Sequence, residues 1–239
     1  MATEAGSARG TYDLVSFDLD GTLVDTAAEI AEAANRALES NGIARRPVAD
    51  IVMLIGAGTR ELMLRLLRQC QQADPLGAGR VRPEPVLASM DLHYAQTTGT
   101  LARPYPGCHE ALAALRAAGV RLACVTNKEE RHARRVLQAS RLDGSFDLLI
   151  GGDTLEQRKP HPGVLRHVVG VFSVEAARAA HVGDSSIDVA AARNAGLAAW
   201  AVPYGYNAGE PIELSQPDRV FDGLESVARH VLSSRRAAA

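Results

Sequence analysis

The run Phe17-Asp18-Leu19-Asp20-Gly21-Thr22-Leu23-Val24-Asp25-Thr26 decides the fold. It places the carboxylates of Asp18 and Asp20 where an apolar strand, expected over residues 12–17, ends in a glycine turn. In open α/β sheets, ligands bind at the carboxyl ends of the strands. Two carboxylates this close repel each other unless a proton or a cation lies between them. We therefore expect a hard divalent cation, held by oxygen ligands, at this turn.

Downstream of residue 107, helical patterns alternate with short apolar segments. The apolar segments are expected to be strands over residues 121–126, 146–150, 180–182 and 197–202. The helices between and around them are expected to end at Gly119, Ser140 and Ala195, with another over residues 163–171. Strands and helices that alternate at this spacing indicate right-handed βαβ units and a parallel sheet. We therefore predict an α/β fold with a Rossmann-like parallel-sheet core.

The segment between the first strand and this alternating region shows helical patterns only. Thr26 and Glu29 have the spacing of a capping box, and a helix is expected from there to Gly42. Apolar residues at helical spacing over residues 62–70, and the pattern over residues 86–97, indicate two more helices. The predicted organisation is thus a core interrupted by a helical cap. The core comprises residues 11–25 and 103–232, and the cap comprises residues 26–102.

The composition is that of an ordinary globular protein. The 239 residues carry a formal net charge of −2, with 23% charged and 46% hydrophobic residues. This balance argues against a nucleic-acid-binding or a disordered chain. The three cysteines, Cys70, Cys108 and Cys124, have no CxxC or Cys/His spacing. Neither a disulfide framework nor a zinc site is therefore expected.

No segment of the sequence predicts attachment to a membrane. The first ten residues lack the apolar stretch of a signal peptide, and no later run approaches the length of a membrane span. We therefore expect a cytoplasmic protein whose partners include neither membrane nor nucleic acid. A homodimer is compatible with the sequence, although no interface is evident in it. The tail from Ser233 is expected to be frayed.

Polar residues follow the predicted strands of the core at their carboxyl ends. In addition to Asp18 and Asp20, these residues are Thr126, Asn127, Lys159, Asp184 and Asp188. Each residue type has a task in phosphoryl transfer, which depends on positioning and charge neutralisation. One carboxylate can attack phosphorus while a second acid protonates the leaving oxygen. A hydroxyl, an amide and an ammonium can hold the phosphoryl oxygens, and further acids complete a Mg²⁺ site.

Four motifs occur in order along the chain. They are DLDGT at residues 18–22, VTN at residues 125–127, Lys159 within KPHP, and GDSSID at residues 183–188. In these motifs the chain resembles the haloacid-dehalogenase-like hydrolase superfamily, and its helical insertion resembles the class 1 cap of that superfamily. Within the superfamily it is most similar to bacterial phosphoglycolate phosphatases. This narrower resemblance rests on the segments DLDGTLVDT, IGAG, YPG, KPHP, GDSSIDVAAARNAG and YGYN.

The resemblance implies a phosphatase that hydrolyses a small phosphomonoester, with 2-phosphoglycolate as the first candidate, through an aspartyl-phosphate intermediate. Asp18 would be the nucleophile, and Asp20 would be the general acid and base. Thr126, Asn127 and Lys159 would bind the transferring phosphoryl group. Lys159 would also offset negative charge around the nucleophile.

The resemblance also implies Mg²⁺ as the cofactor. Asp18, the backbone carbonyl of Asp20, and Asp184 would be its ligands. Asp188 would belong to the same metal site, either through a water molecule or by orienting its neighbours.

Several of these residues also have ordinary structural interpretations. Thr126 could cap a helix, and Asn127 could serve local turn chemistry. Gly56 and Gly58 are expected to form a tight turn between cap helices, which could also face the substrate. Arg60 is a candidate partner for a substrate carboxylate, because arginine pairs with carboxylates in bidentate fashion.

Other functions remain open at this point. A phosphatase for another small sugar phosphate, or an isomerase similar to β-phosphoglucomutase, would use the same first motif and metal site. Dehalogenation is disfavoured, because the dehalogenases of this superfamily attack carbon and do not need the acid at Asp20. A phosphate-accepting receiver domain is disfavoured by the roughly seventy helical residues that follow the first motif.

Overall fold

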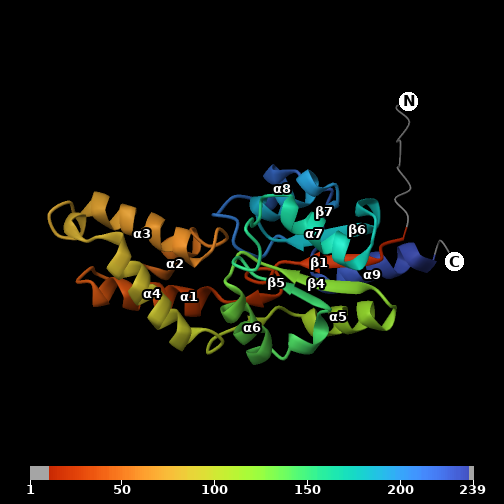
Figure 1. Cartoon of the computed structure of the whole chain (residues 1–239), viewed down its shortest axis with the longest axis horizontal. Helices are drawn as coiled ribbons and strands as arrows, with labels where there is room; N and C mark the ends of the chain where they lie inside the picture. Colours follow the sequence, from red (N-terminus) through yellow and green to blue (C-terminus); the bar gives the residue numbers. More distant parts are fainter. Residues whose placement is uncertain (1–10, 237–239) are drawn as a thin grey trace.

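A parallel six-stranded sheet forms the centre of the core (Figure 1). The computed structural model describes residues 11–236. The strands lie in the order β5-β4-β1-β6-β7-β8. Their bounds are β1 (Leu14–Phe17), β4 (Arg121–Val125), β5 (Leu148–Ile150), β6 (Ala179–Gly183), β7 (Ala198–Ala201) and β8 (Arg219–Val220). The strand β1 is central, since Phe17 lies opposite Cys124 of β4 and Val182 of β6. The predicted α/β fold is confirmed.

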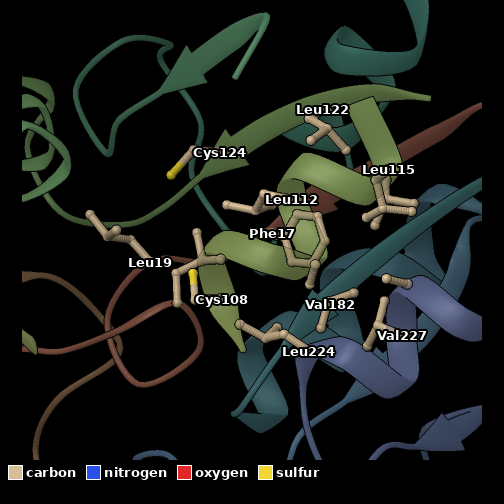
Figure 2. Packing of buried hydrophobic residues seen from close by; sticks show 14 of the residues in the cluster. Phe17, Leu19, Cys108, Leu112, Leu115, Leu122, Cys124, Val182, Leu224 and Val227 are labelled. Carbon is tan, nitrogen blue, oxygen red and sulfur yellow. The ribbon is translucent and has the colours of Figure 1, made fainter. Parts of the chain in front are cut away.

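Helices cover both faces of this sheet. Their bounds are α5 (Cys108–Ala117), α6 (Glu130–Ala139), α7 (Gly163–Phe172), α8 (Ser186–Ala195) and α9 (Leu224–Arg236). Because side chains alternate along a strand, β1 contributes to two apolar clusters. Phe17 lies in the cluster that contains Leu115 of α5 and Val227 of α9 (Figure 2). Leu14 lies in the other cluster, together with residues of α7 and α8.

Four helices form the cap at one end of the molecule, away from the sheet (Figure 1). They are α1 (Ala27–Ser40), α2 (Val48–Val52), α3 (Thr59–Ala73) and α4 (Pro83–Thr97). These helices have their own apolar cluster, whose buried residues lie between Ile30 and Tyr94 in the chain. Two short antiparallel strands, β2 (Val24–Asp25) and β3 (Arg103–Pro104), connect the cap to the core. In this ribbon Asp25 lies opposite Arg103. The domain boundaries at residues 26 and 102 stay a prediction.

The helices and strands predicted over residues 108–202 are confirmed, with ends that differ by at most about two residues, within the usual uncertainty of such boundaries. The strand β8 and the helix α9 were not predicted. Since α9 continues to Arg236, the prediction of a frayed tail from Ser233 is wrong for residues 233–236. Residues 237–239, like the first ten residues of the signal-peptide prediction, lie outside the described part. The chain also contains short 3-10 turns at Ala78–Arg80, Asp143–Ser145, Ala176–Arg178 and Ile212–Ser215.

The capping box predicted at the start of α1 is wrong. The Thr26 hydroxyl donates to Asp20 Oδ1 at 2.6 Å instead of capping the helix. The Glu29 carboxylate is buried and accepts hydrogen bonds from the backbone N–H groups of Gly99 and Leu101, where the chain leaves the cap. Both side chains are thus used for long-range contacts.

Within residues 11–236, none of the helices combines the length and the apolar character needed to cross a membrane.

Candidate active site

The carboxyl ends of three neighbouring strands bring the predicted site residues together. Asp18 follows β1, Thr126 follows β4 and Asp184 follows β6, and these strands are adjacent and parallel. Asp188 lies in the first turn of α8. Lys159 comes from the loop between β5 and α7, and its Nζ lies 2.8 Å from Asp18 Oδ1. The sheet edge therefore collects residues that are far apart in the chain.

The Lys159 ammonium is buried and fully hydrogen-bonded. Its three N–H groups have three acceptors: Asp18 Oδ1 at 2.8 Å, Asp188 Oδ1 at 2.7 Å and the Val125 carbonyl at 2.6 Å. Burial alone would lower the pKa of Lys159, but the carboxylates of Asp18 and Asp188 outweigh burial and raise it above its usual value. Lys159 is thus a fixed positive charge at the end of β1.

Asp188 is held at both of its carboxylate oxygens. Its Oδ2 accepts from the backbone N–H of Ser185 at 3.2 Å, which is one half of the capping box of α8, and it also accepts from the Ser185 hydroxyl at 2.5 Å. Its Oδ1 accepts from Lys159 and lies 3.3 Å from His181 Nε2. Burial would raise the pKa of Asp188, but Lys159 and His181 lower it below its usual range. This arrangement favours the interpretation in which Asp188 orients its neighbours.

Asp184 is bound to the turn that follows β1. Its Oδ1 accepts from the Thr22 hydroxyl at 2.7 Å, and its Oδ2 accepts from the backbone N–H of Tyr206 at 2.5 Å. Gly21 passes so close that a Cβ atom there would lie 2.4 Å from Asp184 Oδ2, and its φ of +88° suits glycine. The glycine of the first motif therefore lets the two acid-bearing turns pack together.

The geometry and the charge of this cluster fit a divalent cation. Asp18, Asp184 and Asp188 each offer a carboxylate oxygen, and these atoms lie within 4.8 Å of one another. Burial raises the pKa of Asp18 to about 7 against the effect of Lys159, and burial and the charges of Asp18 and Asp188 raise the pKa of Asp184. The cluster holds three carboxylates and one ammonium, that of Lys159, which is paired with Asp18 and Asp188 but not with Asp184. Mg²⁺ prefers carboxylate oxygens, so these residues suit it.

Asp20 points away from this cluster and is paired with a lysine that was not predicted as a site residue. Lys128 Nζ donates to Asp20 Oδ1 at 2.6 Å, and the Thr26 hydroxyl donates to the same oxygen. Lys128 is only 3% exposed, and its Nζ lies 5.0 Å from the centre of the Tyr94 ring. Burial would lower the pKa of Lys128, but Asp20 and Tyr94 raise it above its usual value. The available signal in the sequence was its position, directly after Asn127 at the end of β4.

Thr126 and Asn127 are buried at the end of β4, and their side chains form hydrogen bonds with backbone groups of the core and of the cap. The Thr126 hydroxyl accepts from the backbone N–H of Lys128 at 3.2 Å. Asn127 Nδ2 donates to the Lys159 carbonyl at 2.9 Å and to the Gly56 carbonyl of the cap at 3.1 Å. In this arrangement Asn127 joins cap to core, and its contact with a phosphoryl group stays a prediction.

A small cavity lies where the cap meets the sheet edge. Its volume is about 30 Å³. The core lines it with Asp18, Asp20, Thr126, Asn127 and Lys128, and the cap lines it with Ile30, Ile55, Gly56, Gly58, Thr59 and Leu62. The predicted turn at Gly56 and Gly58 therefore faces the site.

Arg60 does not line this cavity. It is exposed and lines a separate hollow of about 240 Å³, together with Tyr94 and Glu129. Close by, the Thr59 hydroxyl donates to Glu129 Oε1 at 2.6 Å, which is a second contact between cap and core. Arg60 therefore lies at the outer side of the joint between cap and core.

Comparison with known proteins assigns the family. Residues 15–202 match the model of the haloacid dehalogenase-like hydrolase family. The chain is 42% identical over 226 residues to the plasmid-encoded phosphoglycolate phosphatase of Cupriavidus necator, covering 94% of this chain and 95% of that protein. It is 38% identical over 220 residues to the phosphoglycolate phosphatase of Nitrosospira multiformis, covering 92% and 96%.

A solved structure agrees with these relatives. The crystal structure of a protein from Haemophilus somnus, titled a predicted phosphoglycolate phosphatase, superposes with a TM-score of 0.88 at 32% identity. The alignment covers 92% of this chain and 97% of that one. The chain therefore belongs to the haloacid dehalogenase-like hydrolase family.

Proposed function

We propose that this hydrolase cleaves small phosphomonoesters, with 2-phosphoglycolate as its substrate, by way of a phosphoryl group carried on Asp18. The observation that carries the proposal is the way the two acids after β1 are held. Lys159 holds Oδ1 of Asp18, while Lys128 and Thr26 hold Oδ1 of Asp20. Within residues 11–236, no hydrogen bond engages the Oδ2 atom of either acid. One carboxylate can therefore attack while its neighbour transfers a proton.

The first half of the reaction forms the intermediate. An Asp18 oxygen attacks phosphorus, and the bond between phosphorus and the ester oxygen breaks. The electron pair of that bond goes to the ester oxygen, which takes a proton from Asp20 and leaves as an alcohol. Lys159 keeps its positive charge beside the attacking carboxylate throughout.

The second half restores the enzyme. Asp20, now a carboxylate, takes a proton from water, and the water oxygen attacks phosphorus. The bond between phosphorus and Asp18 breaks, which releases inorganic phosphate and regenerates the carboxylate. Mg²⁺ held by Asp18, Asp184 and the Asp20 carbonyl, with Asp188 beside them, would offset the negative charge of the phosphoryl oxygens.

The position of the cavity and the names of the relatives support a small substrate. The cavity beside Asp18 lies between the sheet edge and the cap, and both line it. A small ester can contact both at once, whereas the cap would obstruct a large phosphoprotein. The relatives at 42% and 38% identity are both named phosphoglycolate phosphatase. Enclosure by a cap also controls the access of water to the intermediate.

A phosphate-release assay with Mg²⁺ tests this function. The substrates are 2-phosphoglycolate, sugar phosphates, nucleotides and pyrophosphate at matched concentrations. We expect kcat/KM for 2-phosphoglycolate to exceed that for the other esters by about a hundredfold, which corresponds to about 2.7 kcal/mol in the transition state. Absence of phosphate release from every ester would overturn the proposal. Transfer of the phosphoryl group to another position of a sugar would support the isomerase instead.

A further inference from the structure

Lys128 supplies the positive charge of the cavity between cap and core. Among the described residues that line this cavity, it is the only one with a cationic side chain, since Lys159 and Arg60 lie outside the lining. The cap contributes apolar or uncharged groups there, such as Ile55, Gly58 and Leu62. A substrate in this cavity that carries a second anionic group, in addition to its phosphate, could therefore pair that group with Lys128 of the core.

The hydrogen bonds of the Lys128 ammonium leave it able to bind a ligand. An ammonium carries three N–H donors. One donates to Asp20 Oδ1 at 2.6 Å, and the contact with the Tyr94 ring at 5.0 Å accounts for a second. A third donor remains for a group inside the cavity. Because the side chain is 3% exposed, an ion pair formed there would be shielded from solvent.

The position of Lys128 relative to Asp20 indicates which part of the substrate it meets. Asp20 is the acid that protonates the leaving oxygen in the proposed reaction. In 2-phosphoglycolate a single CH₂ group separates that oxygen from the carboxylate carbon. An ammonium 2.6 Å from Asp20 Oδ1 therefore lies beside the leaving group, whereas the ammonium of Lys159 is paired with Asp18, which would carry the phosphoryl group.

We propose that Lys128 binds the carboxylate of the substrate and thereby selects phosphate esters with an anionic leaving group. This inference rests on the proposed phosphatase function. The sequence suggested Arg60 of the cap as the partner of the substrate carboxylate. The structure favours Lys128 of the core instead. Lys128 directly follows the VTN motif at residues 125–127. In this proposal it recognises the leaving group and not the phosphoryl group.

The test compares two esters of nearly equal size. One is 2-phosphoglycolate, and the other is 2-hydroxyethyl phosphate, which carries a neutral CH₂OH in place of the carboxylate. Steady-state kcat and KM for both are measured with the wild-type enzyme and with Lys128→Met, a variant of similar length without the charge. Arg60→Met is the matched control, because it removes a charge near the joint of cap and core but outside the cavity.

We expect the wild-type enzyme to prefer 2-phosphoglycolate by roughly 10- to 100-fold in kcat/KM, the range of a hydrogen bond between charged groups. Lys128→Met should reduce that preference to less than about fivefold, mainly through KM for 2-phosphoglycolate, while Arg60→Met leaves it unchanged. If Lys128→Met does not fold, as judged by circular dichroism, Lys128→Arg and Lys128→Gln take its place. The arginine should then retain the preference and the glutamine should lose it.

Three other results would overturn the inference in different ways. If Lys128→Met lowers kcat/KM for both esters by the same factor, Lys128 acts only by positioning Asp20. If the wild-type enzyme cleaves both esters equally well, it does not recognise a carboxylate, and the proposed preference for 2-phosphoglycolate fails as well. A preference that survives in Lys128→Met would leave the proposed function intact and exclude Lys128 as its cause.

Discussion

Asp18 shares the Lys159 ammonium with Asp188, so neither carboxylate has that charge to itself. Burial raises the pKa of Asp18 to about 7, against the effect of Lys159 and with a further contribution from the charge of Asp188. In the unfolded chain an aspartate titrates near pH 3.9. Without metal, Asp18 is therefore protonated to a greater extent in the folded protein than in the unfolded chain between about pH 4 and pH 7. The contribution of Asp18 to stability should fall as the pH rises through this window, whereas the buried histidines His132 and His181, whose pKa values burial lowers, contribute in the opposite direction.

Replacement of Asp18, the proposed nucleophile, separates the effect on catalysis from the effect on stability. Asp18→Asn should abolish phosphate release, because a neutral amide cannot attack phosphorus. It should also make the metal-free protein more stable than wild type at pH 7.5, since it removes a buried negative charge, and change stability less at pH 4. Thermal unfolding in a chelator from pH 4 to pH 8 measures this effect. The exposed carboxylate of Asp50, changed to Asn, is the control and should leave the profile unaltered. If the unfolding temperatures of wild type and Asp18→Asn changed with pH in parallel, the raised pKa of Asp18 would be contradicted.

Lys159 has a structural task in addition to the catalytic role proposed for it. Removal of one partner from a buried ion pair leaves the other charge uncompensated, which costs about 3–5 kcal/mol. Lys159→Met should therefore lower the free energy of unfolding by about that amount in the absence of metal, besides abolishing activity. Urea denaturation measures the change. Arg65→Met removes an exposed pair with Glu61 on α3 and should change stability by less than about 1 kcal/mol. Similar losses in the two variants would show that Lys159 is not an essential counter-charge.

At the scale of elements, the order of strands and helices in the core could be predicted because it depends on local patterns. Apolar segments separated by amphipathic helices are visible without knowledge of the fold. The helix α9 and the two-residue strand β8 were not predicted. β8 is too short to produce a pattern, while α9 has an amphipathic spacing that could have been recognised, with Leu224, Val227, Ala228 and Val231 on its buried side.

In the candidate site, too, local sequence patterns identify some residues, whereas contacts between distant parts of the chain cannot be predicted from them. Asp18, Asp184 and Lys159 could be predicted, because strand ends and motifs identify them. The pairing of Lys128 with Asp20 could not, since it joins residues 108 positions apart. The capping box at Thr26 failed for a similar reason: the side chain has the right spacing, but Asp20 is its partner in the folded protein.

Tyr206 links Asp184, in the acidic cluster at the sheet edge, to the start of the cap. Its backbone N–H donates to Asp184, and its hydroxyl accepts from the backbone N–H groups of Thr26 at 2.9 Å and Ala27 at 3.1 Å. The same hydroxyl donates to Asp25. The first turn of α1 thus obtains from a distant tyrosine the cap that Thr26 does not supply.

Removal of the Tyr206 hydroxyl tests this link. Tyr206→Phe should lower the free energy of unfolding by about 1–2 kcal/mol, the range of a helix N-cap, and should speed amide exchange in the first turn of α1. Urea denaturation and hydrogen exchange followed by mass spectrometry measure the two effects. Tyr204→Phe is the control, because it loses one hydrogen bond, to the Thr22 carbonyl, and leaves α1 untouched. Equal exchange at α1 in the two variants would contradict this role.

At the scale of the whole molecule, hydrogen bonds join the cap to the core at several points, and two of them lie on either side of Gly58 in the chain. Asn127 Nδ2 binds the Gly56 carbonyl, and the Thr59 hydroxyl binds Glu129. Gly58 fits between them with a φ of +90°, and a Cβ atom there would lie 2.9 Å from the Asn127 carbonyl oxygen. The cap can approach the sheet edge this closely because that position has no side chain. Closure of the cavity should therefore depend on Gly58.

Gly58→Ala should hold the cap away from the core and lower kcat/KM for 2-phosphoglycolate by at least about tenfold, because the cap and core residues that line the cavity beside Asp18 would move apart. Gly42→Ala is the matched control. Gly42 also has a left-handed φ, +73°, but a Cβ atom there meets nothing within 4 Å. Both variants carry backbone strain of about 1–3 kcal/mol, so urea denaturation should show losses of similar size. Only Gly58→Ala should lose activity, and equal kcat/KM in the two variants would show that close contact at Gly58 is not needed for catalysis.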